Sequence, residues 1–401
     1  MPTLLRDVGM APQIFHYSIM VVQSERFDIE PATIKNVTSF RHVRQNVGIG
    51  RRNRKQCPTP RPHVLANVAT TDVLMFLGIE IGGTKLQLGV GRGDGEIVEL
   101  ARRDVDGSRG ADGIREQIVA AGQELISRHP IERIAFGFGG PVLAAEGIVQ
   151  TSHQVAGWDR FPIVSWCESA LGRPTRLGND CDVAGLAEAC FGAGRDNRSL
   201  FYVTVGTGIG GGLIIDRRIH GTHRPAAAEI GHLRPGLDAR TSQQTVEALA
   251  AGPGLAAPLQ HHLKHWQENV GPHPSKSLDN RDAEDLLARC QGDPQSLSTK
   301  QIGEAARAGN QWACTAYQNA TNVLGWAIAQ MITLIAPEVV VVGGGVSLVG
   351  DLFFDPLRQA VDLYAFPPLK HSCSVVPAQL GESVVVHGAL ALAASQAEFG
   401  R

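Results

Sequence analysis

The sequence contains two glycine turns, Glu80-Ile81-Gly82-Gly83-Thr84-Lys85 and Gly206-Thr207-Gly208-Ile209-Gly210-Gly211-Gly212. An apolar segment precedes and follows each turn, so both predict a strand, a tight turn and a second strand. Glycine allows the backbone to turn sharply and to bring its N–H groups close to a polyanion. The two turns therefore predict a pair of β-hairpins that hold phosphate groups.

The glycine spacing of the second turn does not by itself indicate a nicotinamide cofactor. Its G-x-G-x-x-G pattern matches the dinucleotide fingerprint, but that fingerprint requires a helix after the glycines. Here Gly212-Leu213-Ile214-Ile215-Asp216 is β-like, and the sequence has no G-x-x-x-x-G-K-[ST] phosphate loop. Taken singly, each turn is equally compatible with an ordinary glycine hairpin.

Length and composition predict a soluble protein of two domains. The chain has 401 residues, more than one hydrophobic core usually organises. No apolar run approaches the roughly 18 residues of a membrane span. Seven cysteines, none in a C-x-x-C pair, provide neither a disulfide framework nor a zinc ribbon. These features favour a reducing cytoplasm.

Charge is distributed unevenly along the chain. Residues 1–72 contain ten Lys and Arg against five Asp and Glu, whereas residues 73–401 have a formal charge of −7. The basic segment 41–70 has three interpretations: a disordered or mis-started leader, a transit-like sequence, or a nucleic-acid-binding arm. The first is favoured because no amphipathic period persists, so residues 1–72 are predicted to be a disordered extension. The acidic body gives no reason to expect nucleic acid as a partner.

From residue 73 onward the pattern is that of an α/β protein whose second half repeats the plan of the first. The expected strands are 73–81, 86–90, 131–138, 175–177, 200–205, 213–215 and 339–342, and the expected helices are 113–127, 183–191 and 320–335. We predict two lobes, 73–188 and 189–384, each with one phosphate hairpin facing a cleft. A C-terminal helix of about 385–401 is expected to pack back on the first lobe.

Five motifs, in this order along the chain, resemble the ROK family of sugar kinases and repressors. They are Gly78–Lys85 for the first phosphate motif, Asn179-Asp180 for the catalytic pair, Gly206–Gly212 for the second phosphate motif, Glu229-Ile230-Gly231-His232 for the sugar-binding E-x-G-H, and Val341–Ser347 for the adenosine-side motif. The resemblance runs from about residue 78 to residue 387. It implies an actin-like, two-lobe ATPase fold of the hexokinase and ribonuclease H-like type.

Asp180 is the predicted general base. Phosphoryl transfer to an alcohol needs a carboxylate that orients the hydroxyl and accepts its proton. Asp180 follows a predicted strand and precedes a predicted helix, a position that faces the cleft in α/β folds. From the residues alone, Asp180 or Asp182 could instead cap a helix that begins at Val183. The family motif favours the catalytic role and assigns Asn179 to the sugar.

Glu229, His232 and Glu247 are the other predicted sugar-binding residues. Glu229 and His232 are three apart, so one helical turn would point both side chains in the same direction. In general that spacing more often marks a structural surface pair. The resemblance assigns both residues to sugar hydroxyls. It also nominates Glu247, because Gln244–Pro253 resembles a family segment whose Glu reaches the sugar.

The resemblance assigns ATP and Mg²⁺ as cofactors. The residues expected at the nucleotide are Gly82, Gly83, Thr84, Lys85, Thr207 and Gly208 for the phosphates and Gly344 and Gly345 for the adenosine. Glu80 stands where the family usually has Asp and is the candidate magnesium ligand. Its longer side chain moves the carboxylate by roughly an ångström, which is expected to affect turnover more than nucleotide binding.

Two segments depart from the family pattern. Many members have a zinc site of the form C-x-C-G-x-x-G-C, but Leu233–Val246 contains no cysteine. A tetrahedral structural site cannot be built from His232 alone, so no zinc is expected and packing must hold this loop. Ser152–Trp158 resembles a sugar-side segment but lacks the usual Asn, and its His153 is either a substrate contact or a structural histidine.

The sequence thus predicts ATP-dependent phosphorylation of a hexose or N-acylhexosamine, closest to a glucokinase. The alternative is a sugar-sensing ROK repressor, which would carry a helix-turn-helix about as long as residues 1–72. That segment shows no pair of amphipathic helices around a short turn, and repressors often lose the catalytic Asp. The expected partners are a small-molecule sugar and a second copy of the chain in a homodimer, with neither a membrane nor nucleic acid.

Overall fold

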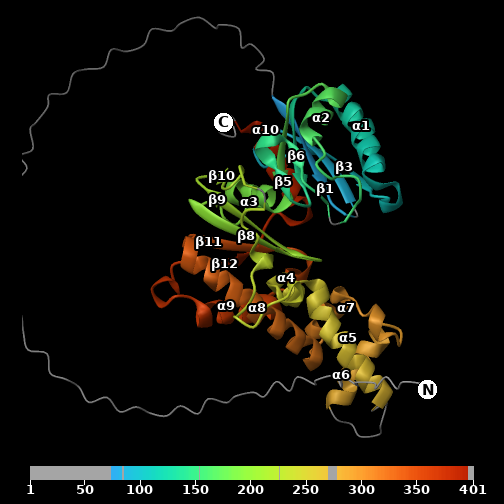
Figure 1. The fold of residues 1–401 in the computed structure, drawn as a ribbon, viewed down its shortest axis with the longest axis vertical. Coiled ribbons are helices and arrows are strands. Elements are labelled where there is room, and N and C mark those ends of the chain that lie inside the picture. Colours follow the sequence, from blue (N-terminus) through green and yellow to red (C-terminus); the bar gives the residue numbers. More distant parts are fainter. Residues whose placement is uncertain (1–73, 84, 153, 225, 270–277, 396–401) are drawn as a thin grey trace, which may run out of the picture. The chain divides into compact units, whose positions relative to one another are not determined.

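The computed structural model describes residues 74–83, 85–152, 154–224, 226–269 and 278–395. The chain divides into two units, Met1–Asn67 and Val68–Arg401, and every described residue belongs to the second. The predicted extension 1–72 therefore lies outside the described residues. Figure 1 shows two five-stranded sheets and the helices around them.

The first sheet has the strand order β3-β2-β1-β4-β7. Its strands are β1 (Met75–Ile81), β2 (Lys85–Gly91), β3 (Ile97–Asp104), β4 (Ile131–Phe138) and β7 (Thr175–Asn179). β1 and β2 form the antiparallel hairpin around the first glycine turn, and β4 and β7 extend the sheet in parallel. Alternate residues of β1, such as Leu77 and Ile79, pack with helices α1 (Gly110–Arg128) and α2 (Ile163–Leu171) on one face of the sheet.

The second sheet has the order β10-β9-β8-β11-β12. Its strands are β8 (Ser199–Val205), β9 (Ile209–Ile215), β10 (Arg218–Ile219), β11 (Val339–Gly343) and β12 (Ser374–Pro377). β8 and β9 are antiparallel around the second glycine turn, while β11 and β12 are parallel to β8. The second half therefore repeats the topology of the first, as the sequence predicted. β11 is buried along its whole length, which fits its run of four valines.

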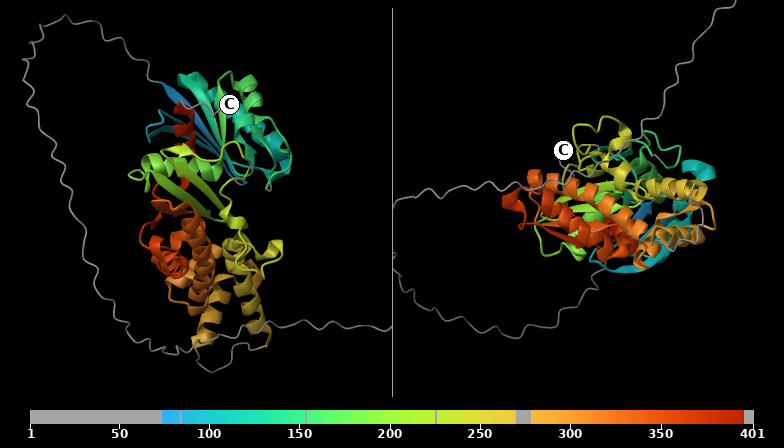
Figure 2. Two further views of the ribbon diagram at one scale, coloured as in Figure 1. Left: turned by 60° about the vertical axis from the view of Figure 1, so that its left-hand side comes forward. Right: turned by 90° about the horizontal axis from the view of Figure 1, so that it is seen from below.

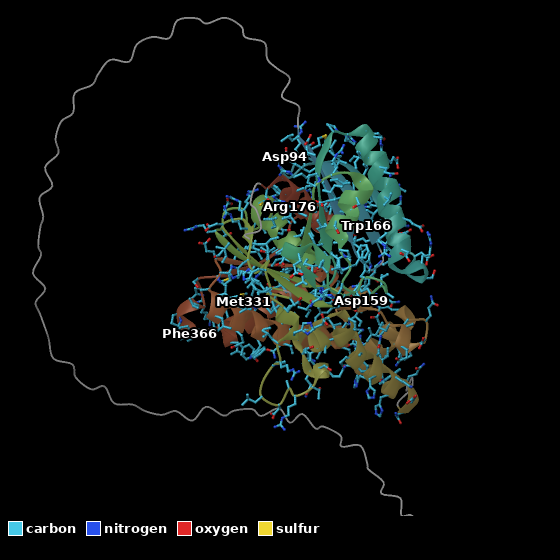
Figure 3. All side chains as sticks on the ribbon, turned by 45° about the horizontal axis from the view of Figure 1, so that its top comes forward. Asp94, Asp159, Trp166, Arg176, Met331 and Phe366 are labelled. Atoms are coloured by element: carbon cyan, nitrogen blue, oxygen red, sulfur yellow. The ribbon has the colours of Figure 1, made fainter. Side chains whose placement is uncertain are left out.

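Two helices join the sheets, α3 (Asp180–Phe191) and α10 (Val384–Ala394). α3 leads from β7 of the first sheet toward β8 of the second, and α10 packs on β1, β4 and α3. A Cβ at Gly388 would lie 1.8 Å from the carbonyl oxygen of Val183, so only glycine allows this close approach of the two helices. Arg176 of β7, labelled in Figure 3, secures the end of α10 by donating hydrogen bonds from Nη1 to the carbonyl oxygen of Leu392 and to Ser395 Oγ.

Six helices share one hydrophobic core with the other face of the second sheet, and α4–α7 pack on α8 (Figure 2). They are α4 (Val246–Ala250), α5 (Gly252–Asn269), α6 (Leu278–Arg289), α7 (Thr299–Arg307), α8 (Gln311–Ile335) and α9 (Asp351–Tyr364). Phe201 and Val203 of β8 share a core with Leu324 and Ile328 of α8, and each such buried side chain contributes about 1.5–3 kcal/mol. Within the described residues, no helix combines the length and apolar character that a membrane span requires.

Several helix boundaries differ from the sequence-based expectation. The helix expected at 183–191 begins at Asp180, and the one expected at 320–335 begins at Gln311. In both cases an asparagine caps the true first turn: Asn310 Oδ1, for example, accepts a hydrogen bond from the backbone N–H of Ala313 at 3.1 Å. Helices α2, α4–α7 and α9 were not predicted from the sequence. The remaining short strands, β5 (Val142–Leu143) and β6 (Ile148–Val149), form a hairpin of their own.

Candidate active site

The chain passes directly from β7 into α3, and this junction positions the predicted catalytic pair. Asn179 is the N-cap residue, because its Oδ1 accepts hydrogen bonds from the backbone N–H groups of Cys181 at 2.8 Å and Asp182 at 3.3 Å. These amides would otherwise lack a partner within the helix. The alternative that Asp180 or Asp182 caps a helix at Val183 is therefore wrong.

A cavity of about 630 Å³ brings three sequence motifs together. Its walls include Glu80 and Lys85 of the first hairpin, Asp180 of α3, and Gly344 and Gly345 beyond β11. The three segments lie at the carboxyl ends of β1, β7 and β11. Ligands of α/β sheets bind outside such strand ends.

The environment of Asp180 raises the pKa of its carboxyl group above the value in water. Burial raises the pKa of Asp180 to about 6, and the nearby charge of Glu229 adds to the rise. A hydrogen bond from the backbone N–H of Cys181, at 2.9 Å, opposes it. A carboxylate that titrates this close to neutrality is suited to accept a proton from an alcohol.

Glu80 is buried and held by two neighbours. Gln87 Nε2 donates a hydrogen bond to Glu80 Oε2 at 2.5 Å, and Lys85 Nζ lies 3.9 Å from Glu80 Oε1. Arg102 Nε in turn donates to Gln87 Oε1 at 3.0 Å. Burial raises the pKa of Glu80, whereas the charge of Lys85 and the hydrogen bond from Gln87 lower it. The candidate magnesium ligand is thus already part of a chain of polar contacts that links β3, β2 and β1.

The first glycine turn lies against a side chain from a distant segment. The backbone N–H of Gly82 donates to the carbonyl oxygen of Lys85 at 3.0 Å and closes the turn. A Cβ at Gly83 would lie 1.8 Å from Gln154 Oε1, so a larger residue there would displace this side chain. The turn therefore contacts the segment that the sequence analysis assigned to the sugar side. Thr84 and His153, two residues considered for the site, lie outside the described residues.

The second glycine turn packs directly on the start of α3. A Cβ at Gly210 would lie 2.4 Å from Cys181 Sγ, and one at Gly212 would lie 2.9 Å from the Cα of Asp182. Side chains at these two positions would push β9 away from the helix. Glycine thus allows the second phosphate hairpin to lie beside the helix that carries Asp180.

Glu247 braces the second glycine turn from α4. Its Oε2 accepts a hydrogen bond from the backbone N–H of Ile209 at 2.8 Å, and a Cβ at Gly208 would lie 2.6 Å from the same oxygen. The backbone N–H of Gly252 adds a bond to the carbonyl oxygen of Gly206, also at 2.8 Å. The described contact of Glu247 is therefore with the phosphate turn, and its predicted contact with a sugar stays a prediction.

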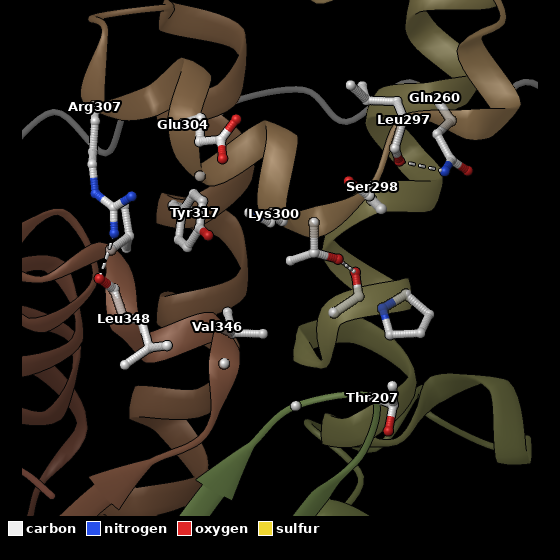
Figure 4. A pocket seen from close by; sticks show the side chains of 18 residues that line it. Thr207, Gln260, Leu297, Ser298, Lys300, Glu304, Arg307, Tyr317, Val346 and Leu348 are labelled. Atoms are coloured by element: carbon white, nitrogen blue, oxygen red, sulfur yellow. Dashed lines mark hydrogen bonds between the residues drawn. The ribbon is translucent and has the colours of Figure 1, made fainter. Parts of the chain in front are cut away.

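A larger cavity, of about 830 Å³, lies beside the second turn (Figure 4). Thr207 lines it from the turn, Lys300 and Arg307 from α7, and Val346 from the segment after β11. Arg307 Nη2 donates a hydrogen bond to the carbonyl oxygen of Leu348 at 2.5 Å and joins two of its walls. The residues of α7 were not predicted to line a site, because the Ser298–Gln301 capping box indicates the start of a helix and does not indicate a ligand.

A narrow pocket of about 20 Å³ contains two of the predicted sugar-binding residues, Asn179 and Glu229. Its other lining residues are Pro141, Val142, Ala144, Asp182, Thr222, Arg224, Ala226 and Ala227. Asn179 Nδ2 also donates to the carbonyl oxygen of Gly140 at 3.0 Å. This volume holds about one water-sized group, such as a hydroxyl.

His232 does not share this pocket with Glu229. The helical turn that was expected to carry both residues is a 3-10 helix of Ile230–His232, and Glu229 precedes it with a non-helical ψ of 69°. The side chain of His232 is exposed, whereas Glu229 is half-buried. The two side chains therefore differ in exposure, and a shared contact of Glu229 and His232 with a sugar stays a prediction.

Hydrogen bonds hold the loop between His232 and α4. The backbone N–H of Val246 donates to the carbonyl oxygen of Leu233 at 2.8 Å and closes the loop. Gln244 Oε1 accepts hydrogen bonds from the backbone N–H groups of Arg240 at 2.8 Å and Thr241 at 3.1 Å. A capping box thus organises part of this loop, where Leu237 is 97% exposed while Thr245 and Val246 are buried.

Comparison with known proteins finds relatives along most of the chain. The family model described as ROK family matches residues 76–396. A glucokinase from Streptomyces coelicolor is 30% identical over 324 residues, which cover 80% of this chain and 97% of the relative. The crystal structure of a ROK family glucokinase from Streptomyces griseus in complex with glucose and AMPPNP has a TM-score of 0.66 and 29% identity, and the match covers 80% of this chain and 99% of that one.

A repressor is also among the relatives. A putative xylose repressor from Caldicellulosiruptor is 24% identical over 381 residues, which cover 93% of this chain and 90% of the relative. The family model spans both sheets and ends beyond α10. The chain therefore belongs to the ROK family and has the actin-like ATPase fold of its sugar kinases.

Proposed function

We propose that this protein is an ATP-dependent sugar kinase that phosphorylates a hexose or an N-acylhexosamine in the manner of a glucokinase. The observation that carries the proposal is the position of Asp180 at the start of α3, in a cavity shared with Glu80 of the first hairpin and Gly344 of the adenosine-side motif. The pKa of about 6 suits Asp180 to act as a general base. The glucokinase relatives support the same activity.

In this proposal, Asp180 orients one hydroxyl of the sugar and accepts its proton as the oxygen attacks the terminal phosphate of ATP. Asn179 and Glu229 hold other hydroxyls at the narrow pocket. His232 is exposed, so it reaches the sugar only after a movement of its 3-10 turn or of the lobes. Lobe closure of this kind would also exclude water and limit wasteful hydrolysis of ATP.

The residues present fit a nucleotide. The cavity of about 830 Å³ lies within the size range of small-molecule sites and is lined by Gly206, Thr207 and Gly345. Cβ atoms built at Gly206 and Gly345 meet no atom within 4 Å, so the backbone at both positions faces open space. We assign the adenosine to this cavity, beside Gly345, which lines it, and Gly344, which lines the neighbouring cavity of about 630 Å³. We assign the phosphates to Gly82, Gly83, Thr84, Lys85, Thr207 and Gly208.

Magnesium would offset the charge of the phosphates, and Glu80 is the proposed protein ligand. Its Oε2 is engaged by Gln87, while its Oε1 faces Lys85 at 3.9 Å. A hard cation that keeps most of its water shell suits this arrangement, because it needs only one or two carboxylates in addition to the phosphates.

The decisive test is sugar-dependent release of ADP from ATP by the full-length chain in the presence of magnesium. Glucose, N-acetylmannosamine, N-acetylglucosamine, fructose and allose form the panel. We expect at least one to be phosphorylated, with glucose or an N-acylhexosamine preferred. If none of them stimulates ADP release, the kinase proposal fails. We further propose that the enzyme acts in the cytoplasm as a homodimer, which light scattering on the purified protein would check.

A sugar-sensing repressor is the second candidate, and one observation favours it. The match to the putative xylose repressor covers 93% of this chain, more than the residues from 74 onward can supply. Part of the extension therefore aligns with that repressor. The test is whether the full-length chain binds DNA fragments specifically and releases them when a sugar is added. If sugar releases the DNA and the chain phosphorylates no sugar, the repressor proposal replaces the kinase proposal.

A further inference from the structure

Asp182 has a buried oxygen that no protein group satisfies. Among the described residues, nothing hydrogen-bonds to Asp182 Oδ1, although this atom is shielded from solvent. The backbone N–H of the same residue is satisfied by Asn179 Oδ1. Buried polar atoms in native proteins nearly always have a partner, so an unpartnered one at a candidate site is expected to meet a group from outside the protein, such as a ligand hydroxyl.

The packing of α3 on β9 holds the backbone that carries this oxygen. A Cβ at Gly212 would lie 2.9 Å from the Cα of Asp182 and 2.7 Å from the carbonyl oxygen of Cys181, so the strand lies close against the first turn of the helix. The Cα of Asp182 therefore has little room to move toward β9.

Asp182 lines the narrow pocket together with Asn179 and Glu229. Thr222 and Arg224 border the same pocket from the segment that follows β10, and Asp180 lies two residues earlier in the first turn of α3. The pocket has room for about one hydroxyl-sized group. Asp180 is assigned to the hydroxyl that is phosphorylated, so Asp182 would meet a different hydroxyl of the same molecule.

We propose that Asp182 is a further substrate-contacting residue, which hydrogen-bonds a sugar hydroxyl other than the one that is phosphorylated and so helps to select the sugar. The inference rests on the proposed function, because it places the sugar at the narrow pocket.

The surroundings of Asp182 also define how it makes this bond. Burial raises the pKa of Asp182 to about 8, and the charges of Asp180 and Glu229 add to the rise. The carboxyl group is therefore neutral at pH 7, with one O–H donor and one acceptor oxygen. A neutral carboxyl can both donate a hydrogen bond to a hydroxyl oxygen and accept one from a hydroxyl proton, whereas a carboxylate can only accept.

The test compares Asp182→Ala, Asp182→Asn and the control Asp196→Ala in the full-length chain. Asp196 is 90% exposed and paired only with its neighbour Arg195, so the control removes the same group away from the pocket. The affinities for the best substrate and for its monodeoxy analogues are measured by calorimetry, together with KM, kcat and melting temperature. The wild type is expected to lose at least 10-fold in affinity for one deoxy analogue.

We expect Asp182→Ala to raise the sugar KM about 10- to 100-fold, leave the ATP KM within 2-fold, and bind that deoxy analogue as well as the parent sugar. Asp182→Asn, which keeps a donor and an acceptor, should restore most of the affinity. Its sugar KM should no longer rise above pH 8, where the wild-type carboxyl loses its proton. Without sugar, Asp182→Ala should melt no lower than the wild type, because it removes an unpaired buried oxygen.

Three results would overturn the proposal. They are a sugar affinity in Asp182→Ala equal to that of the wild type, a deoxy discrimination that survives the substitution, or a wild type that binds no sugar of the panel. A wild type that binds sugar but transfers no phosphate would instead refute the kinase proposal and leave the contact of Asp182 testable by calorimetry. A lower melting temperature for Asp182→Ala, with unchanged affinity, would identify a purely structural role.

Discussion

Glu247 Oε2 accepts a hydrogen bond from the backbone N–H of Ile209, with 2.8 Å between the two atoms. This contact ties α4 to the glycine turn between β8 and β9. Because Thr207 of that turn borders the large cavity, the contact associates Glu247 with the proposed nucleotide site and not with the proposed sugar site. The sequence motif assigned it to the sugar, so the two interpretations predict different kinetic defects.

Glu247→Ala is predicted to raise the ATP KM about 10-fold and the sugar KM less than 3-fold. Without the carboxylate, the amide of Ile209 loses its partner, and the turn that we propose to hold the phosphates should become less ordered. Initial rates measured with each substrate varied in turn would separate the two constants. The control is Glu146→Ala, because Glu146 is exposed and lines none of the cavities described above. A larger effect on the sugar KM would restore the assignment made from the sequence.

The main features of the fold were accessible from the sequence because local chemistry determines them. The glycine turns, the four valines of β11 and the apolar strands have unambiguous patterns, and each forms the predicted element. The start of α3 was placed three residues late, because an Asn N-cap resembles any other polar loop residue until its bonded partners are known.

The site was less accessible, since it depends on distances between segments far apart in the chain. The sequence could nominate Asp180 and Glu229, but it could not show that Glu247 turns toward Ile209 or that His232 is exposed. Asp182 was considered only as a possible cap. Its unpaired oxygen is visible only once α3 is packed on β9.

Ala228 is predicted to be a point of stored strain beside Glu229. Its φ of +62° lies in the left-handed region, which disfavours residues with a Cβ. Ala228→Gly should stabilise the protein by about 0.5–1 kcal/mol, less than the full steric penalty because glycine also gains freedom in the unfolded chain. Calorimetry should show a melting temperature about 1–2 °C higher.

The matched control for this substitution is Ala227→Gly. Ala227 is not one of the described residues with a positive φ. Glycine at this position relieves no backbone strain, so it should lower the melting temperature. If both substitutions lower it, the conformation of Ala228 is not strained. A higher melting temperature with a raised sugar KM would show that the strain serves to position Glu229.

Glu80→Asp is predicted to lower the magnesium concentration needed for half-maximal turnover, with little change in sugar affinity. In the proposed site, Gln87 Nε2 would compete with the cation for Glu80 Oε2, and the shorter aspartate side chain would lie farther from that donor. Magnesium titration at saturating ATP and sugar measures the effect. The buried Gln87 loses one partner, so the melting temperature should fall slightly. A higher magnesium requirement would mean that the cleft is already adapted to glutamate.

The rate should depend on pH through Asp180. Because the base must be ionised, kcat/KM is predicted to rise with pH through an inflection near 6, the pKa set by burial of this carboxyl. Glu229→Gln removes a neighbouring negative charge that raises this pKa, so it should move the inflection to lower pH. An unchanged inflection in Glu229→Gln would contradict the coupling between the two carboxylates.

Asp180→Asn gives the sharpest test, because catalysis and stability are expected to change in opposite directions. The amide keeps the size of the side chain but cannot accept the proton, so sugar phosphorylation should fall about 10²–10⁴-fold while ATP still binds. The raised pKa means that Asp180 favours folding below about pH 4 and loses that contribution as pH rises through about 6. The variant should therefore be more stable than the wild type at pH 7, and this advantage should shrink as the pH falls toward 4. Chemical denaturation at several pH values measures it. Near-normal turnover by the variant would mean that Asp180 is not the base. A stability that does not exceed that of the wild type at pH 7 would mean that the ionised carboxylate does not destabilise the fold.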